Sequence, residues 1–243
     1  MLSNVFLQTG VVLTLCSCTS FASVPETSWR VSIAAPSLYP VNVTQSYGIN
    51  EHENWTSSLH NFTQFMRVTD IKNVRKRFPR YDGFGIPIQD YTMIRSRQVS
   101  PTNHIPEVIY LYWVSLANTQ FYVTKYPVSN AVKKAMRMET SYTRGDGATI
   151  DSCYRIEFVF GLFPNGQAKV FLKGCGELIF LTDLAPDSIL DKDSNGFGIE
   201  DYMKKSYFKR IQKRAEDAGV VIDPVSWDKV NKIYSKENII ELH

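Results

Sequence analysis

The sequence lacks the local motifs that mark the common enzyme classes. It contains no Gly-x-Ser-x-Gly nucleophile elbow, no His-Glu-x-x-His zinc helix, no phosphate-binding glycine loop and no Cys-x-x-Cys pair. Histidine is rare, and His52, His60 and His104 lie in polar or proline-flanked segments that are typical of solvent-exposed loops. We therefore expect that the protein is not an enzyme, although a site assembled from distant residues would leave no such motif.

The chain also lacks an excess of charge of one sign. Its net charge is +3 and it has no long basic run, whereas nucleic-acid binding needs a dense basic surface. We therefore expect no nucleic-acid partner. Aromatic residues, by contrast, are abundant, with 13 tyrosines and 14 phenylalanines. Because aromatic side chains suit half-buried pleated surfaces, this composition favours β-sheet.

No apolar run is long enough to remain as a transmembrane helix. The run from Val5 to Leu15 has the length of a signal-peptide core. It leads into Leu15-Cys16-Ser17-Cys18, which resembles the bacterial lipobox and predicts that Cys18 carries the lipid. The alternative is a buried N-terminal strand with two incidental cysteines, because the segment before the apolar run has no Lys or Arg.

These features predict how the chain is organised. Residues 1–17 would be a lipoprotein signal peptide, 18–28 a lipidated tether, and 29–243 a single globular domain. Thr19 stands where some enteric lipoproteins have the aspartate that retains them in the inner membrane. By that resemblance, we expect an outer-membrane lipoprotein that faces the periplasm.

Two further cysteines remain in the exported domain, Cys153 and Cys175. An even number of thiols in an oxidising compartment predicts one disulfide between them. The two residues lie nearly symmetrically about a predicted hairpin turn, Phe163-Pro-Asn-Gly166, where facing residues have a spacing that suits a disulfide. Such a bridge would stabilise the domain by about 3 kcal/mol.

Apolar alternation and short apolar runs predict a series of β-strands. The clearest are two hairpins, one over 107–126 and one around the turn at 163–166. Helical spacing predicts a helix over 130–138 capped by Ser129, an amphipathic helix from Ile199 that ends at Gly219, and a short one from Ser226 to Ile233. We therefore predict an α+β fold, with an antiparallel β-sheet or sandwich built from hairpins and C-terminal helices packed on it.

Two segments are rich in basic residues. The stretch 67–97 is interrupted by glycine and proline, and we interpret it as a solvated loop region rather than a binding patch. The predicted helix from Ile199 to Gly219 carries six lysines and arginines on its outer faces. Such a face is usually only the solvated side of an amphipathic helix, but it could also lie on anionic lipid or an acidic partner.

One segment resembles a metal-binding loop. Asp191, Asp193 and Asn195 occupy positions 1, 3 and 5 before a glycine, as in the first half of an EF-hand calcium loop, and Glu200 stands at position 10. Position 12, where an EF-hand has a bidentate glutamate, is Tyr202. The four acidic and amide residues are a candidate calcium site. The alternative is a turn-rich loop whose carboxylates cap the following helix, without any metal.

Several segments together resemble a bacterial family known as domain of unknown function 2931. They span most of the predicted domain, and they are Trp29-Arg-Val-Ser-Ile-Ala-Ala-Pro36, Tyr39-Pro40, Pro106-Glu-Val-Ile-Tyr-Leu-Tyr-Trp-Val-Ser115, Phe121-Tyr122, Gly161-Leu-Phe-Pro-Asn-Gly-Gln-Ala-Lys-Val-Phe-Leu172 and Ser226-Trp227. Many members of the family carry a lipobox, which agrees with Cys18. The family has no established activity, so the resemblance implies no catalytic residue.

The resemblance and the predicted export lead to two functional expectations. Some small envelope lipoproteins of this kind resemble immunity proteins that neutralise lipase effectors of type VI secretion, so the first is a lipid-anchored protein that binds a secreted lipase or other toxin. This expectation rests on analogy. The second is a structural or calcium-stabilised envelope lipoprotein with no toxin partner and no other cofactor.

Overall fold

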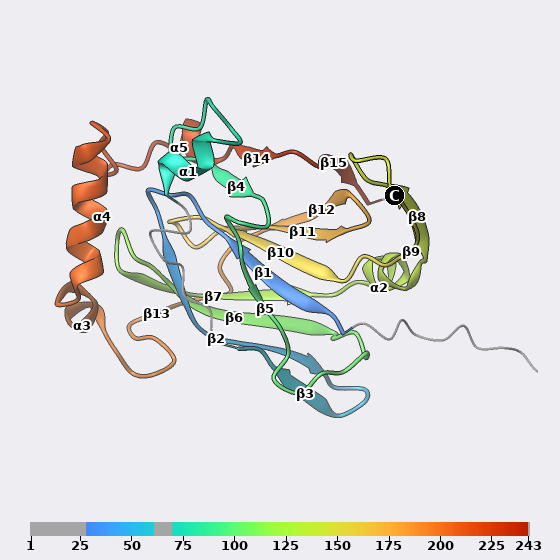
Figure 1. The fold of residues 1–243 in the computed structure, drawn as a ribbon. Helices are drawn as coiled ribbons and strands as arrows, with labels where there is room; N and C mark the ends of the chain where they lie inside the picture. Colours follow the sequence, from blue (N-terminus) through green and yellow to red (C-terminus); the bar gives the residue numbers. More distant parts are fainter. Residues whose placement is uncertain (1–27, 61–69, 243) are drawn as a thin grey trace, which may run out of the picture.

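Two β-sheets form the centre of the molecule. The computed structural model describes residues 28–60 and 70–242, and within them the larger sheet has six strands in the order β15-β12-β11-β10-β1-β5 (Figure 1). Their bounds are β1 Arg30–Ala34, β5 Ile94–Ser96, β10 Glu157–Leu162, β11 Ala168–Gly174, β12 Glu177–Leu184 and β15 Asn238–Glu241. The smaller sheet has the order β13-β7-β6-β2-β3. Its strands are β2 Val41–Asn50, β3 Trp55–Ser58, β6 Val108–Ser115, β7 Gln120–Pro127 and β13 Ser188–Leu190.

The main core lies between the two sheets, which are stacked one above the other in Figure 1. Val31 and Phe158 of the larger sheet and Leu111 and Trp113 of the smaller sheet belong to one buried cluster. Helix α2 (Asn130–Arg137) adds Val132 and other apolar side chains to it. Each sheet therefore directs one row of alternating apolar residues into a shared interior, as in a β-sandwich.

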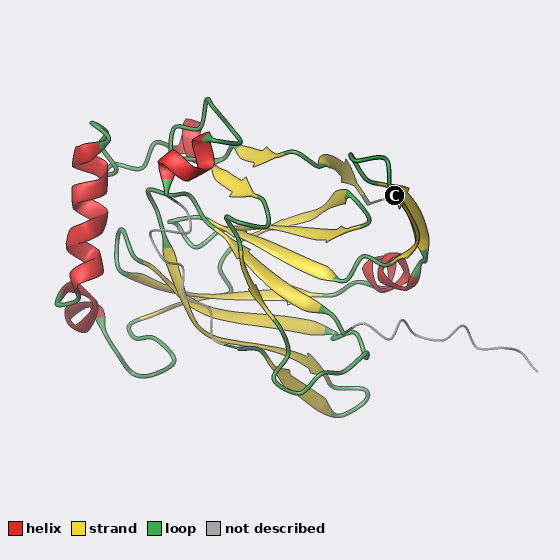
Figure 2. Cartoon of the chain, in the orientation of Figure 1, coloured by secondary structure: helices red, strands yellow, loops and turns green. Residues whose placement is uncertain are grey.

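A second buried cluster covers the other face of the larger sheet. There β4 (Ile86–Ile88) pairs with β14 (Ile233–Ser235), and helices α1 (Ile71–Arg75) and α5 (Trp227–Val230) lie beside them (Figure 2). Val159 and Phe171 of the sheet belong to this cluster together with Ile86, Val74 and Val230. The larger sheet is thus buried on both faces, which explains the continuous apolar runs in its central strands.

Helices α3 (Ile199–Met203) and α4 (Ser206–Asp217) occupy one end of the molecule (Figure 1). Tyr202, Ile211 and Ala215 are buried members of the second cluster, and the Tyr202 ring meets Phe121 edge to face. The sequence predicted one continuous helix here, but a break at Lys204–Lys205 divides it into two. None of the helices in the described ranges is long and apolar enough to cross a bilayer.

The expected β-rich fold is confirmed, and so are the two hairpins, β6–β7 and β10–β11. The expected antiparallel pairing is confirmed in the smaller sheet, but the larger sheet is mixed, because β1 pairs with β10 in parallel and β12 with β15 in parallel. The last predicted helix is also shorter than expected, since Ile233 already begins β14. The parallel strand pairs join segments far apart in the chain, so no local turn pattern predicts them.

Strand β2 continues seven residues past Val43, to Asn50. Its pairing with β6 shifts register between Val43 and Gln45, which indicates a β-bulge at Thr44. Beyond the bulge, Ser46, Gly48 and Asn50 point to the buried side in place of apolar residues. The alternation of apolar residues therefore stops in the sequence while the strand continues.

The predicted disulfide between Cys153 and Cys175 is present, with the Cα atoms 5.6 Å apart. The two cysteines were predicted to face each other across the β10–β11 hairpin, but they do not. Cys153 ends β9 (Thr149–Cys153), which pairs with β8 (Thr140–Thr143), and Cys175 lies in the turn between β11 and β12. The bond therefore ties the β8–β9 hairpin to the β11–β12 turn of the larger sheet.

Candidate binding site at Trp227

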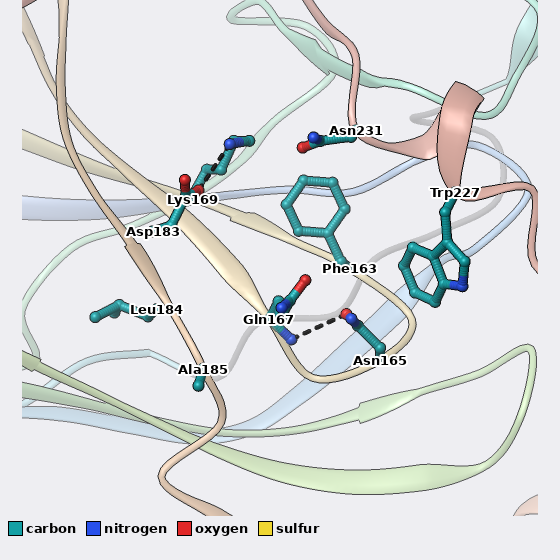
Figure 3. A pocket seen from close by; sticks show the side chains of 9 residues that line it. All are labelled: Phe163, Asn165, Gln167, Lys169, Asp183, Leu184, Ala185, Trp227 and Asn231. Carbon is teal, nitrogen blue, oxygen red and sulfur yellow. Dashed lines mark hydrogen bonds and ion pairs between the residues drawn. The ribbon is translucent and has the colours of Figure 1, made fainter.

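A hollow of about 540 Å³ opens where strands β10, β11 and β12 of the larger sheet end or begin. Three segments line it: the turn between β10 and β11, the end of β12, and α5. The lining residues are Phe163, Asn165, Gln167, Lys169, Asp183, Leu184, Ala185, Trp227 and Asn231 (Figure 3). We call this feature the Trp227 hollow.

The β10–β11 turn forms one wall and is held firmly from behind. Gly166 adopts a φ of 88°, which favours glycine, and a Cβ at this position would lie 2.5 Å from the Tyr122 ring. The carbonyl of Pro164 accepts hydrogen bonds from the Asn118 amide at 2.8 Å and the Tyr122 hydroxyl at 3.2 Å. The Asn-Gly turn predicted from the sequence is thus fixed against β7.

Trp227 forms the opposite side. It begins α5, which is anchored by the fully buried Val230, so the short helix holds the indole at the surface. The side of the helix bearing Trp227 is open, and 45% of the residue is exposed. Figure 3 shows the Phe163 ring between Trp227 and the Lys169–Asp183 pair. Phe163 is 4% exposed and forms an apolar floor.

The charges of the hollow are already paired. Lys169 Nζ lies 2.7 Å from Asp183 Oδ1, and the same ammonium sits 5.5 Å from the centre of the Phe180 ring. The other polar lining groups are the neutral amides of Asn165, Gln167 and Asn231. An apolar centre with an amide-rich, charge-balanced edge suits recognition of a partner by burial and hydrogen bonding.

The candidate calcium residues do not converge on one point. Asp193 Oδ1 accepts hydrogen bonds from the backbone N–H groups of Asn195 at 2.8 Å and Phe197 at 2.9 Å, and its Oδ2 accepts the Tyr202 hydroxyl at 2.6 Å. Asp191, Asn195 and Glu200 are exposed. Over the described residues, no group of three or more His, Cys, Asp or Glu side chains is placed to hold a metal ion.

The start of α3 has its own cap. The Asp201 carboxylate accepts the backbone N–H of Gly198 at 3.0 Å, so the capping carboxylate differs from those singled out in the sequence. These contacts are the ones expected of a turn-rich loop before a helix. Cys18, the predicted signal peptide and residues 18–27 of the predicted tether lie outside the described residues.

Comparison with known families identifies the chain. The model of the family described as "Protein of unknown function (DUF2931)" matches residues 16–228. The chain belongs to the DUF2931 family. No curated protein and no solved structure matches it.

Two segments that carried the resemblance to DUF2931 meet at the Trp227 hollow. One is Gly161–Leu172, which supplies the turn and Lys169, and the other is Ser226–Trp227. They are separated by more than fifty residues in the chain, so no local pattern indicated that they are in contact. The exposed Trp227 was part of the recognised pattern, but its role as the wall of a hollow was not predicted.

This DUF2931 chain also contains a charged cluster that sequence reasoning missed. Glu157 of β10 is completely buried, although the alternation in its strand placed it among the polar residues. Its carboxylate binds Arg30 at 2.9 Å, Arg95 at 3.1 Å and the Ser32 hydroxyl at 2.6 Å. Ion pairs of Arg95 with Asp90, and of Lys173 with Asp90 and Glu237, extend the cluster. We call this set of six charged residues the Glu157 cluster.

Proposed function

We propose that this DUF2931 chain is an exported, lipid-anchored protein of the bacterial cell envelope whose domain acts by binding another protein at the Trp227 hollow. The observation that carries the proposal is the exposure of Trp227 beside the buried Phe163 floor. A tryptophan that served only to pack the fold would be buried, as Trp29 and Trp113 are.

Burial of Trp227 against a partner would supply much of the binding energy. Tryptophan is enriched among the few interface residues that dominate affinity, and such residues sit in desolvated pockets with a polar rim. The amides of Asn165, Gln167 and Asn231 supply that rim. Because Lys169 and Asp183 neutralise each other, a partner would leave no charge unpaired on closing the hollow.

The partner that we favour is a secreted lipase or similar toxin, which the protein would neutralise as an immunity protein. This choice rests on the resemblance between small envelope lipoproteins of this kind and immunity proteins of type VI secretion. A lipid on Cys18 would hold the domain at the outer membrane, facing the periplasm, where such a toxin attacks. The alternative is a structural or calcium-stabilised envelope lipoprotein without a toxin partner.

The test is a pull-down with the full-length protein against secreted and periplasmic proteins of its own species, followed by mass spectrometry. A stoichiometric toxin that is lost with Trp227→Ala and retained with Tyr91→Ala would support the proposal. Tyr91 is a suitable control because it is also exposed, at 40%, and lies outside the hollow. Envelope-assembly proteins alone, or equal capture by both variants, would contradict it.

The anchor is tested separately. Cys18→Ala should release the protein from membranes and abolish labelling by a radioactive or clickable fatty acid. Cys16→Ala is the matched control, because the lipobox places the lipid on the later cysteine. Unchanged membrane fractionation of Cys18→Ala would contradict the lipoprotein proposal without bearing on the Trp227 hollow.

A further inference from the structure

A second and larger concavity, of about 800 Å³, lies between helices α1 and α4. Its lining contains five basic side chains, which are Lys72 and Arg75 of α1 and Arg210, Lys213 and Arg214 of α4. Among the described residues, two carboxylates line it, those of Asp70 and Asp217. We call this feature the α1–α4 groove; it shares no lining residue with the Trp227 hollow.

Helical spacing explains why the basic residues gather there. In α4, Ile211 and Ala215 are buried in the second apolar cluster. The positions beside that stripe, Arg210, Lys213 and Arg214, are separated by three and four residues and therefore share one face. In α1, Ile71 and Val74 are buried, which leaves Lys72 and Arg75 on the outside. The two basic faces border the same groove.

Both carboxylates of the groove are already engaged. Asp70 caps α1, where its Oδ1 accepts the backbone N–H groups of Lys72 at 2.9 Å and Asn73 at 3.2 Å. Asp217 pairs with Lys213 at 3.0 Å. Within the described residues, neither Lys72 nor Arg210 forms an ion pair, so the groove holds more positive charge than its own acids neutralise.

Two of the guanidinium groups are held in place by the protein. Arg75 Nε donates to the carbonyl of Tyr81 at 2.7 Å, and Arg214 Nη1 donates to the carbonyl of Ser37 at 3.0 Å. Burial lowers the pKa of Arg214, and the Asp70 carboxylate offsets only part of this effect. An anion in the groove would meet two guanidinium groups that the fold already holds in position.

We propose that the α1–α4 groove binds a phosphate-bearing ligand, either a free phosphate compound or the head group of an anionic lipid. Phosphate presents several charged acceptor oxygens within a small volume, which matches fixed guanidinium groups supplemented by a lysine ammonium. The groove has the volume of a small-ligand site and is concave. A single carboxylate would neutralise less of the excess charge.

Isothermal titration calorimetry with sodium pyrophosphate, in chloride buffer of matched ionic strength, tests the site on the full-length protein. We expect Lys72→Gln and Arg210→Gln each to weaken pyrophosphate binding by about tenfold, the loss of one charge-assisted hydrogen bond. Lys209→Gln is the matched control, because Lys209 is an exposed basic neighbour in α4 outside the groove. Urea unfolding of each variant verifies that it is folded.

Flotation with vesicles distinguishes the two sources of phosphate. Binding to phosphatidylglycerol vesicles but not phosphatidylcholine vesicles, with loss in Arg210→Gln, would identify a lipid head group. Pyrophosphate binding without flotation would identify a free phosphate compound. The proposal is overturned if neither probe binds, or if Lys209→Gln weakens binding as much as Arg210→Gln. Trp227→Ala should leave both measurements unchanged, which separates this site from the proposed protein interface.

Discussion

Arg30 of β1 and Glu157 of β10 face each other across a parallel strand pair, with Arg30 Nε 2.9 Å from Glu157 Oε2. The carboxylate is fully buried, while 32% of the Arg30 side chain is exposed. Arg95 of β5 reaches the other carboxylate oxygen from the far side of β1. One buried acid thus connects three adjacent strands, including the parallel pair that no hairpin enforces.

Replacing Glu157 by Gln should therefore lower the free energy of unfolding by about 2 to 4 kcal/mol, as expected when one partner of a buried ion pair is removed. The value should fall toward the lower limit, because both arginines remain partly exposed. Urea unfolding measures it. Asp146→Asn is the control: its pair with Arg144 is more than half exposed and should contribute less than about 1 kcal/mol. Equal losses would contradict the structural role of the Glu157 cluster.

A pair of glycine variants tests the wall of the Trp227 hollow. Gly166 and Gly147 both have positive φ, but a Cβ at Gly166 would meet the Tyr122 ring whereas one at Gly147 would meet nothing within 4 Å. Gly147→Ala should cost about 1 kcal/mol of stability from backbone strain alone. Gly166→Ala should cost about 1 to 3 kcal/mol more, because the turn or Tyr122 must move. Thermal or urea unfolding of the two variants measures the difference, and equal losses would show that the turn is loosely held.

The same turn shows what the sequence could predict. Its Asn-Gly dipeptide and the apolar alternation on both sides are local signals, and they indicated two strands, β10 and β11, joined by this turn. The β6–β7 hairpin and the α2 helix, whose cap Ser129 accepts the Val132 N–H at 3.3 Å, were predictable for the same reason. In each case the information lies within about twenty residues.

Long-range features were not predictable in this way. The pairing of β1 with β10 joins residues more than a hundred positions apart, and a polar residue such as Glu157 looks solvent-exposed until its partners are known. The Trp227 hollow and the α1–α4 groove are likewise built from segments that meet only in the folded chain. The sequence identified the disulfide partners, yet it assigned Cys153 to the wrong hairpin, because Cys153 ends β9 and β10 begins only at Glu157.

The loop before α3 offers a test between its two interpretations. Asp193→Ala removes two backbone contacts and the Tyr202 hydroxyl contact, so we expect a loss of about 1 to 2 kcal/mol with either calcium or chelator present. A calcium site predicts instead that calcium raises the Tm and that Asp191→Asn abolishes the rise. Differential scanning calorimetry with and without calcium distinguishes the two. A stability loss of Asp193→Ala that occurs only in calcium would favour the metal.

Glu237 gives the protein a pH dependence of defined sign. Burial raises the pKa of Glu237, and the Lys173 ammonium 3.2 Å from its Oε1 offsets this only in part; the nearby carboxylates of Asp90 and Glu157 raise it further. Its Oε2 is buried without a hydrogen-bond partner in the described part of the chain. The folded state therefore holds a proton on Glu237 at a pH where the unfolded chain has lost it.

This contribution to stability is complete below the ordinary glutamate pKa and is lost as the pH rises through the raised pKa of Glu237. Glu237→Gln mimics the protonated form, so its stability relative to the wild type should increase over that range and then level off. Burial alone would raise the pKa of Asp90, but Lys173 and Arg95 lower it. The contribution of Asp90 to stability therefore increases with pH, and it is present in both the wild type and the variant. Urea unfolding of wild type and variant from pH 4 to pH 8 isolates the Glu237 effect by difference. Glu241→Gln, on the exposed strand β15, is the control. If the stability of Glu237→Gln relative to the wild type falls as the pH rises, the raised pKa of Glu237 is contradicted.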